Sequence, residues 1–224
     1  MRYRARMSAG IDQDVAAIQN RLALTPDTMS VAEFVPNEHI MRLSLSFDID
    51  QLRAAADSVI ASFHDQGSGF SSKQVTMRPG ATDVTQTDLS GRYWFRPDDS
   101  YEEVPREDIV DEAAYSDLHP DFSGTYLETV HAELAARFTL GRMRLLMKDS
   151  YNCNSWHRDP EPRLHIPIYS NPGSLFVVNH HCTHLPADGS VYFTDTRGYH
   201  TAMNGGEQRR LHLVAALVAV PQPL

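Results

Sequence analysis

The chain of 224 residues has few cysteines and no long apolar segment. Its two cysteines, Cys153 and Cys182, are too few for a disulfide framework and indicate a reducing compartment. No segment approaches the roughly 18 consecutive apolar residues that a membrane-spanning helix needs. The basic start, Met1–Arg6, is not followed by the apolar stretch of a secretory signal. We therefore expect a cytoplasmic protein with no membrane partner.

Basic residues are also in the minority. The chain has 20 Lys and Arg against 29 Asp and Glu, a formal net charge of −9, which argues against a nucleic-acid partner. Its hydrophobic content of 42% and charged content of 22% are those of a globular protein. A chain of this length fits one large domain with a substantial core, so we expect a single domain over residues 1–224.

Residues 1–140 read as helices, strands and covering loops. Helical spacing of Val15, Ile18 and Leu22 predicts a helix over 11–24. Asp50 is the expected N-cap of a second helix ending near Gly67, and the pair Thr125 and Glu128 predicts a capping box for a third helix that Gly141 closes. Strands are expected over 41–49 and 70–77. The polar segment 80–121 suits either an ordered cover or a mobile lid, and its acidic run 98–112 reads as solvated surface.

Residues 141–224 change in character and read as the catalytic core. Short strands separated by turn signals are expected at 142–148, 154–159, 162–169, 174–179, 183–187, 190–194 and 209–219. So many strands without a long helix between them favour a closed or sandwich-like β architecture. The fold class we expect is mainly β with flanking helices (α+β).

A His-x-Asp pair at His157 and Asp159 is the central motif of this core. Alternation along a strand directs both side chains to one face. An imidazole and a carboxylate are two ligands of the facial triad that binds ferrous iron and leaves positions open for a cosubstrate and dioxygen. His200, in the loop after the apolar run 191–193, is the expected third ligand.

Two further strands each place an arginine and a histidine on one face. On the first strand, Arg163 and His165 share one face, and Leu164 and Ile166 share the opposite face. On the second strand, Arg210 and His212 share one face. Buried charges require partners, and a site containing iron and an anionic cosubstrate would provide them. The forked guanidinium of Arg210 suits the distal carboxylate of 2-oxoglutarate.

Together these motifs resemble the aspartyl/asparaginyl β-hydroxylase family, which includes hydroxylases of free amino acids. The matching residues are His157, Asp159, Arg163–Pro167, Gly189–Phe193, Asp195, Thr196, His200, Asn204 and Arg210–His212. The resemblance covers roughly residues 140–220. It implies a double-stranded β-helix (jelly-roll, cupin-like) core, Fe(II), 2-oxoglutarate and O2, and hydroxylation of an unactivated carbon in an amino-acid-like small molecule or peptide. It also implies that His157, Asp159 and His200 are catalytic metal ligands, that Arg210 binds 2-oxoglutarate, and that Arg163 and His165 face its metal-binding end.

Two other classes remain open from the residues. A cupin-like binding or sensing module would use the same strands around a metal without oxygen chemistry. A zinc hydrolase would need a general base beside a metal-bound water, and the sequence offers no clear acid for it. The histidines at positions 180, 181 and 184 read as a polar hairpin edge rather than a second metal site. The substrate and the oligomeric state stay open.

Overall fold

The computed structural model describes residues 13–25, 32–89, 93–96, 102–106 and 110–219. The chain divides into two compact units, Met1–Ser30 and Val31–Leu224. In the first unit, residues 13–22 form the expected helix, whereas residues 11 and 12 lie outside the described part. Val15, Ile18 and Leu22 are all exposed, so the apolar stripe of this helix is not buried in the described structure.

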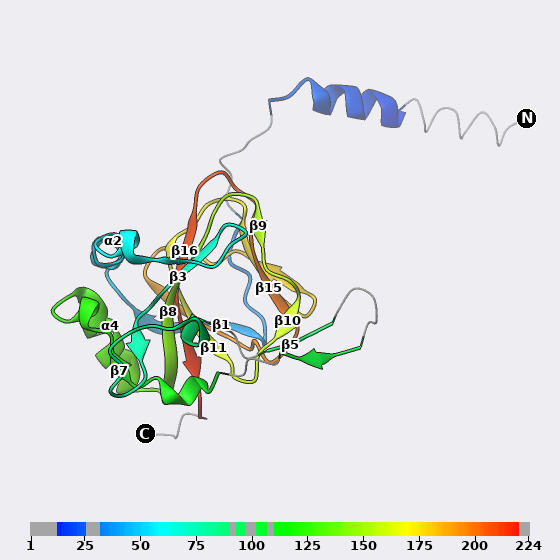
Figure 1. The fold of residues 1–224 in the computed structure, drawn as a ribbon. Helices are drawn as coiled ribbons and strands as arrows, with labels where there is room; N and C mark the ends of the chain where they lie inside the picture. Colours follow the sequence, from blue (N-terminus) through cyan, green and yellow to red (C-terminus); the bar gives the residue numbers. More distant parts are fainter. Residues whose placement is uncertain (1–12, 26–31, 90–92, 97–101, 107–109, 220–224) are drawn as a thin grey trace, which may run out of the picture. The chain divides into compact units, whose positions relative to one another are not determined.

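The second unit is built on a seven-stranded antiparallel sheet (Figure 1). Its strands, in spatial order, are β1 (Ile40–Ser46), β14 (Ser190–Thr194), β11 (Arg163–Tyr169), β16 (Arg210–Leu217), β8 (Leu140–Lys148), β3 (Phe70–Gln74) and β2 (His64–Asp65). Strands from both sides of residue 140 therefore share this sheet. The division into a covering region and a catalytic core at that residue remains a prediction.

A second antiparallel sheet contributes the other half of the β architecture. Its strands, in spatial order, are β13 (His181–Thr183), β12 (Ser174–Val178), β15 (His200–Asn204), β10 (His157–Arg158), β5 (Trp94–Phe95) and β6 (Val104–Pro105), and β9 (Asn152–Cys153) pairs with β15. A small sheet joins β4 (Thr76–Met77) to β7 (Asp117–Leu118). The mainly β class with flanking helices is confirmed.

The hydrophobic core lies between the first sheet, which contains β11 and β16, and two helices, α2 (Ile49–Asp57) and α4 (Tyr126–Ala135). Figure 1 shows these helices together on one side of that sheet. Leu164, Ile166 and Ile168 of β11 and the alternate residues Leu211, Leu213, Ala215 and Leu217 of β16 pack into this core, as their alternation predicts. Each fully buried leucine contributes about 1.5–3 kcal/mol. The opposite faces of the same strands are thereby directed away from this core.

Helix boundaries differ from the sequence predictions for local reasons. The N-cap of α2 is Asp48, whose side chain accepts hydrogen bonds from the backbone amides of Asp50 and Gln51, so the prediction of Asp50 as cap is wrong. The helix ends at Asp57 and is followed by the 3-10 turn η1 (Ile60–Ser62). At α4, Glu128 accepts from the backbone amide of Gly124, while Thr125 makes no side-chain cap.

Gly141 lies within β8 and does not close α4, which ends at Ala135. A Cβ at Gly141 would meet the backbone oxygen of Glu112 at 2.5 Å. The glycine therefore permits the 3-10 turn η2 (Glu112–Ala114) to approach β8 closely.

Several strands also end elsewhere than predicted. The expected strand 70–77 breaks at Val75, whose amide donates to Met143 while its carbonyl accepts from His119, so the chain changes sheets there. The predicted strand 154–159 follows β9 and contains the shorter β10. The strand β13 begins and ends earlier than the predicted strand 183–187. Within 80–121, the described residues form α3 (Gln86–Leu89), β5, β6, η2, β7 and η3 (Pro120–Phe122). None of the helices in the described ranges has the length and apolar composition of a membrane span.

Candidate active site

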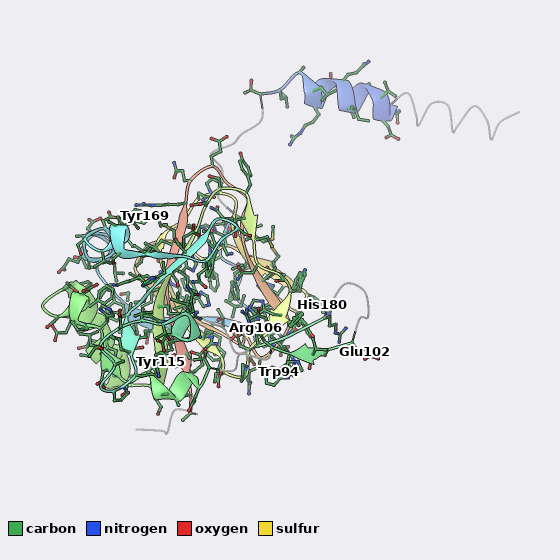
Figure 2. All side chains as sticks on the ribbon, viewed as in Figure 1. Trp94, Glu102, Arg106, Tyr115, Tyr169 and His180 are labelled. Carbon is green, nitrogen blue, oxygen red and sulfur yellow. The ribbon has the colours of Figure 1, made fainter. Side chains whose placement is uncertain are left out.

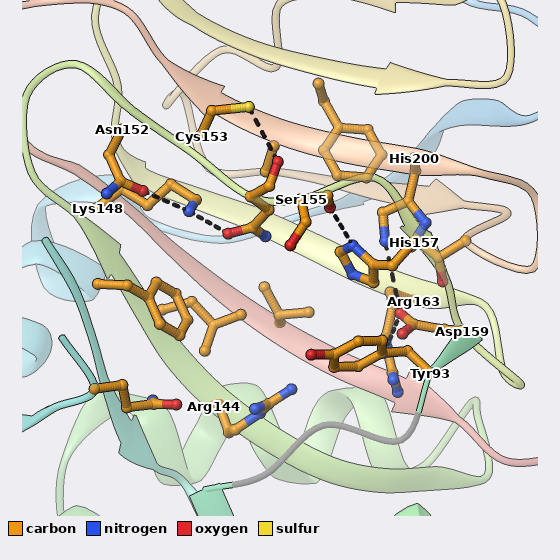
Figure 3. A pocket seen from close by; sticks show the side chains of 18 of the residues that line it. Tyr93, Arg144, Lys148, Asn152, Cys153, Ser155, His157, Asp159, Arg163 and His200 are labelled. Atoms are coloured by element: carbon orange, nitrogen blue, oxygen red, sulfur yellow. Dashed lines mark hydrogen bonds and ion pairs between the residues drawn. The ribbon is translucent and has the colours of Figure 1, made fainter. Parts of the chain in front are cut away.

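A cavity of about 480 Å³ opens among the chemistry-bearing residues of both sheets (Figure 3). The second sheet, which contains β10 and β15, contributes His157 and His200, and the first sheet, which contains β11 and β16, contributes Arg163, His165 and Arg210. The ring of Phe176, on β12, contacts both His165 and His200, with centroids 4.9 and 5.8 Å apart. The cavity thus lies where the inner faces of the two sheets meet.

The three predicted ligands converge at this cavity. His157, Asp159 and His200 each offer a ligand atom, and these atoms lie within 4.8 Å of one another. His157 and His200 are direct partners across the β10–β15 pair, and Nε2 of His200 lies 3.7 Å from Oδ2 of Asp159. His200 opens strand β15 rather than ending a loop, so its predicted loop position is wrong. The strand pairing fixes the position of its ring.

Both imidazoles are oriented by backbone carbonyls. Nδ1 of His157 lies 2.7 Å from the carbonyl of Ser155, and Nδ1 of His200 lies 3.1 Å from that of Gly198. A carbonyl oxygen only accepts, so each Nδ1 carries the proton and each Nε2 keeps its lone pair. This is the arrangement expected of histidines that bind a metal through Nε2. Burial lowers the pKa of His200 to about 4, which keeps its ring neutral.

Asp159 is held as a carboxylate by a buried arginine. Nε of Arg163 donates to Oδ2 of Asp159 at 3.1 Å, and the aspartate backbone amide donates to the carbonyl of Thr196. Burial alone would raise the pKa of Asp159, but Arg163 and the two imidazoles nearby outweigh it and lower the pKa. Because the charge is already present, the side chain is ready to bind a cation.

A second buried acid, Glu112, lies behind this pair. It accepts two hydrogen bonds from Arg142, at 2.7 and 3.0 Å, and one from Arg163 at 3.2 Å. Its side chain is fully buried, so the prediction that the run 98–112 is solvated surface is wrong at this residue. Burial would raise the pKa of Glu112, but Arg163 and Arg142 outweigh it and lower the pKa to about 2. Tyr115, labelled in Figure 2, follows the same turn, and the Arg142 guanidinium lies over its ring.

Arg210 lies in the cavity with a histidine at its back. One of its terminal nitrogens lies 2.9 Å from Nδ1 of His212, while its buried Nε has no hydrogen-bond partner among the described residues. No acid in the described ranges forms an ion pair with this buried guanidinium. Burial lowers its pKa. A buried cation with a free donor is complementary to a carboxylate that enters the cavity.

Three cations follow one another on the cavity side of β8, namely Arg142, Arg144 and Lys148. Lys148 lies opposite Arg210 in register, and its Nζ donates to Oδ1 of Asn152 at 2.9 Å and to Oδ1 of Asn154. Burial and the neighbouring Arg210 lower the pKa of Lys148 to about 8. Neither Arg144 nor Lys148 was predicted as a site residue, although alternation along 142–148 places both on one face.

The β5–β6 pair lies beside His157, one of the candidate metal ligands. Phe95 pairs with His157 across β5 and β10, and the Tyr93 ring lies 5.1 Å from the His157 ring. Arg158 points away from the triad and forms hydrogen bonds with Glu103. The described part of the covering segment is thus connected to the same strand that carries a ligand.

The remaining histidine cluster does not form a metal site in the described structure. Nε2 of His181 lies 2.6 Å from the carbonyl of Val35, and Nδ1 of His184 lies 2.8 Å from that of Ser174. These backbone contacts agree with the prediction of a polar hairpin. Among the described residues, the group that combines three potential ligands is His157, Asp159 and His200.

Comparison with known proteins identifies the architecture. No family model and no curated protein matches the chain. A solved oxidoreductase of the 2OG-Fe(II) oxygenase family from Burkholderia pseudomallei is similar over 84% of this chain and 94% of its own, with a TM-score of 0.51 and 15% identity. The chain has the fold of that enzyme. This confirms the predicted double-stranded β-helix core.

Two further solved structures are similar to the chain at lower TM-scores. A viral collagen prolyl hydroxylase from Paramecium Bursaria Chlorella virus-1 covers 82% of this chain and 97% of its own, with 9% identity and a TM-score of 0.44. A prolyl-4-hydroxylase from Pseudomonas putida covers 80% and 91%, with 11% identity and the same TM-score. These similarities do not extend to the narrower aspartyl/asparaginyl β-hydroxylase family, which remains a proposal.

Proposed function

We propose that the protein is a ferrous-iron- and 2-oxoglutarate-dependent oxygenase that hydroxylates an unactivated carbon of an amino-acid side chain, free or in a peptide. In this proposal His157, Asp159 and His200 bind the metal, and Arg210 binds the distal carboxylate of 2-oxoglutarate. The resemblance to aspartyl/asparaginyl β-hydroxylases supports the substrate class. The observation that carries the proposal is the presence, in one cavity, of three convergent ligand atoms and a buried guanidinium without an acid partner in the described residues.

The residues present fit both absent groups. Two imidazoles with free Nε2 atoms and one carboxylate are the donor set that ferrous iron takes in this class of enzyme. The orphan Nε of Arg210 provides the donor for an anion. When bound, iron with 2-oxoglutarate and dioxygen supplies C–H hydroxylation coupled to the conversion of 2-oxoglutarate to succinate and carbon dioxide.

The protein's own residues contribute positioning and charge. Arg163 orients the Asp159 carboxylate, and the carbonyls of Ser155 and Gly198 orient the two rings. His212 positions the Arg210 guanidinium from behind. His165, whose pKa burial lowers well below its ordinary value, presents a neutral ring beside the metal-binding end of the cosubstrate.

The test is succinate formation from 2-oxoglutarate with ferrous iron and dioxygen, together with mass detection of one added oxygen in a candidate substrate. We expect iron-dependent succinate that is lost in D159A. Metal binding without any consumption of 2-oxoglutarate would instead favour a cupin-like binding protein.

A further inference from the structure

Arg144 is a cation of the cavity that the proposed metal and cosubstrate sites do not use. Its side chain lines the cavity and is half-buried. Within the described residues it forms no hydrogen bond and no ion pair. Burial, followed by the charge of the neighbouring Arg142, lowers its pKa to about 9, whereas Glu112 acts in the opposite direction. A guanidinium in this position is costly unless a ligand supplies the missing anion.

The pairing of β8 with β16 in the first sheet separates Arg144 from Arg210, the proposed 2-oxoglutarate-binding residue. Lys148 pairs with Arg210, and Arg144 pairs with Val214. Four residues along a strand correspond to roughly 13 Å between the Cα atoms of Arg144 and Lys148. A carboxylate bound by Arg210 would therefore lie near the Arg210–Lys148 pair, whereas Arg144 lies at a different position along the strands.

Arg144 lies at the position along the sheet that is next to the proposed metal ligands. Val214 pairs on its other side with His165, so Arg144 and His165 flank it with their Cα atoms roughly 10 Å apart. Two residues before His165, Arg163 contacts the ligand Asp159. Figure 3 shows Arg144 directed into the same cavity as His157, Asp159 and Tyr93.

The charge balance of the cavity also leaves Arg144 unmatched. The described lining residues include the cations Arg106, Arg144, Lys148, Arg163 and Arg210 and a single carboxylate, Asp159. That carboxylate and Glu112 compensate Arg163. The distal carboxylate of 2-oxoglutarate would compensate the Arg210 end, beside Lys148. The positive charge of Arg144 is then left without a paired carboxylate among the described residues.

We propose that Arg144 binds a carboxylate of the substrate and so restricts the enzyme to small carboxylic acids and to residues that present a carboxylate. The inference rests on the proposed oxygenase function. Leu146 and Val214 beside Arg144, with Leu89 and Phe70, give the cavity an apolar wall for the carbon chain between that carboxylate and the carbon that reacts. The carboxylate has two possible sources, the main-chain carboxylate of a free amino acid and the side-chain carboxylate of an acidic residue.

The test measures succinate formation above the substrate-free rate for three sets of compounds. These are the free L-amino acids, their methyl esters with every carboxylate esterified, and N-acetylated, C-terminally amidated peptides that contain either Asp or Glu or only neutral residues. We expect stimulation by carboxylates and none by the esters or the neutral peptides. Stimulation confined to free amino acids identifies the main-chain carboxylate, and stimulation by acidic peptides identifies the side chain.

Variants of Arg144 provide the second part of the test. For the most effective acid, R144Q should raise KM about 10- to 100-fold, the range expected for a charge-assisted hydrogen bond. R144K should recover part of the loss. R137Q removes an exposed arginine that follows the C-terminal end of α4 and should leave KM unchanged. Anaerobic calorimetry with the same acid should show the same loss of affinity in R144Q, while the affinity for 2-oxoglutarate stays at the wild-type value.

Three results would overturn the inference. The first is that esters or neutral peptides stimulate as well as acids, or that no acid stimulates at all. The second is an unchanged KM in R144Q. The third is loss of 2-oxoglutarate binding in R144Q, since Arg144 would then belong to the cosubstrate site. A wild-type protein that neither binds 2-oxoglutarate nor forms succinate would instead contradict the oxygenase proposal, and this inference with it.

Discussion

Arg163 donates from Nε to Oδ2 of Asp159 at 3.1 Å and, through a terminal nitrogen, to Glu112 at 3.2 Å. One side chain thus joins a proposed metal ligand to a fully buried acid in the wall of the site. The same acid receives a two-pronged contact from Arg142. The carboxylate ligand is therefore fixed by a network that extends from β11 to β8 through η2.

R163Q should weaken metal binding about 10- to 100-fold, because partners that orient a metal ligand typically contribute that much. Mn²⁺ is a suitable probe because it does not oxidise readily, and calorimetry gives its affinity directly. R197Q, which removes an exposed arginine paired with Asp195, is a matched control. Wild-type affinity in R163Q would show that the ion pair does not orient Asp159.

E112Q should lower the free energy of unfolding by about 3–5 kcal/mol, since it removes the buried counter-charge that Arg142 and Arg163 share. Urea unfolding followed by circular dichroism measures the change. E133Q removes an exposed acid of α4 and should change stability by less than about 1 kcal/mol. A loss in E112Q no larger than in E133Q would contradict the account of the buried network.

The stabilisation by Glu112 should also depend on pH. Its pKa is lowered from 4.5 to about 2 in the folded protein, so its charge stabilises the fold fully above pH 4.5. That contribution is lost as the pH falls from 4.5 towards 2. The difference in unfolding free energy between wild type and E112Q should therefore shrink over this interval, while titrations shared by both proteins cancel. A constant difference from pH 6 to pH 3 would show that the pKa of Glu112 is not lowered.

Binding of 2-oxoglutarate should weaken as the pH rises through about 8. Lys148 lies opposite Arg210, and its pKa of about 8 means that it is charged below that pH and neutral above it. A bound anion favours the charged form, so affinity is higher on the acid side. Anaerobic titrations at pH 7 and pH 9 measure this, with K148M as the variant in which the Lys148 contribution is absent. Equal pH dependence in wild type and K148M would exclude Lys148 as its source.

Alternation along a strand predicts which side chains face the cavity and which face the core. His157 and Asp159 lie on one face of their segment, and the alternate residues of 162–169 and 209–219 separate the core from the cavity as expected. His200 was predicted as the third ligand but placed in a loop. The strand His200–Asn204 is short and mixes polar with apolar residues, so its sequence has no clear alternation.

The buried ionic network was missed for a different reason. Glu112 is the last acid of a charged run, and local composition does not distinguish it from its solvated neighbours. The available signal was on the partner strand, where Arg142, Arg144 and Lys148 share one face of a core element. Several cations on such a face imply anionic partners, protein or ligand. Which acid pairs with which arginine depends on tertiary contacts between residues far apart in the sequence.

Substitution of Arg210 should separate the binding of 2-oxoglutarate from the binding of the metal. R210Q should lower affinity for 2-oxoglutarate about 10- to 100-fold, because it removes a charge-assisted donor from a buried site. Affinity for Mn²⁺ alone should stay within about twofold of wild type, since Arg210 contacts none of the three ligands in the described structure. Equal losses for both would indicate that R210Q disturbs the whole site.

The central claim is that two imidazoles, one carboxylate and Arg210 form a single site for ferrous iron and 2-oxoglutarate. Anaerobic titration of the full chain with ferrous iron and then 2-oxoglutarate, followed by visible absorption, tests it most directly. We predict a weak charge-transfer band that saturates at one equivalent of iron, requires 2-oxoglutarate and is absent in D159A. A folded wild-type protein that gives no band at saturating concentrations of both would contradict the account.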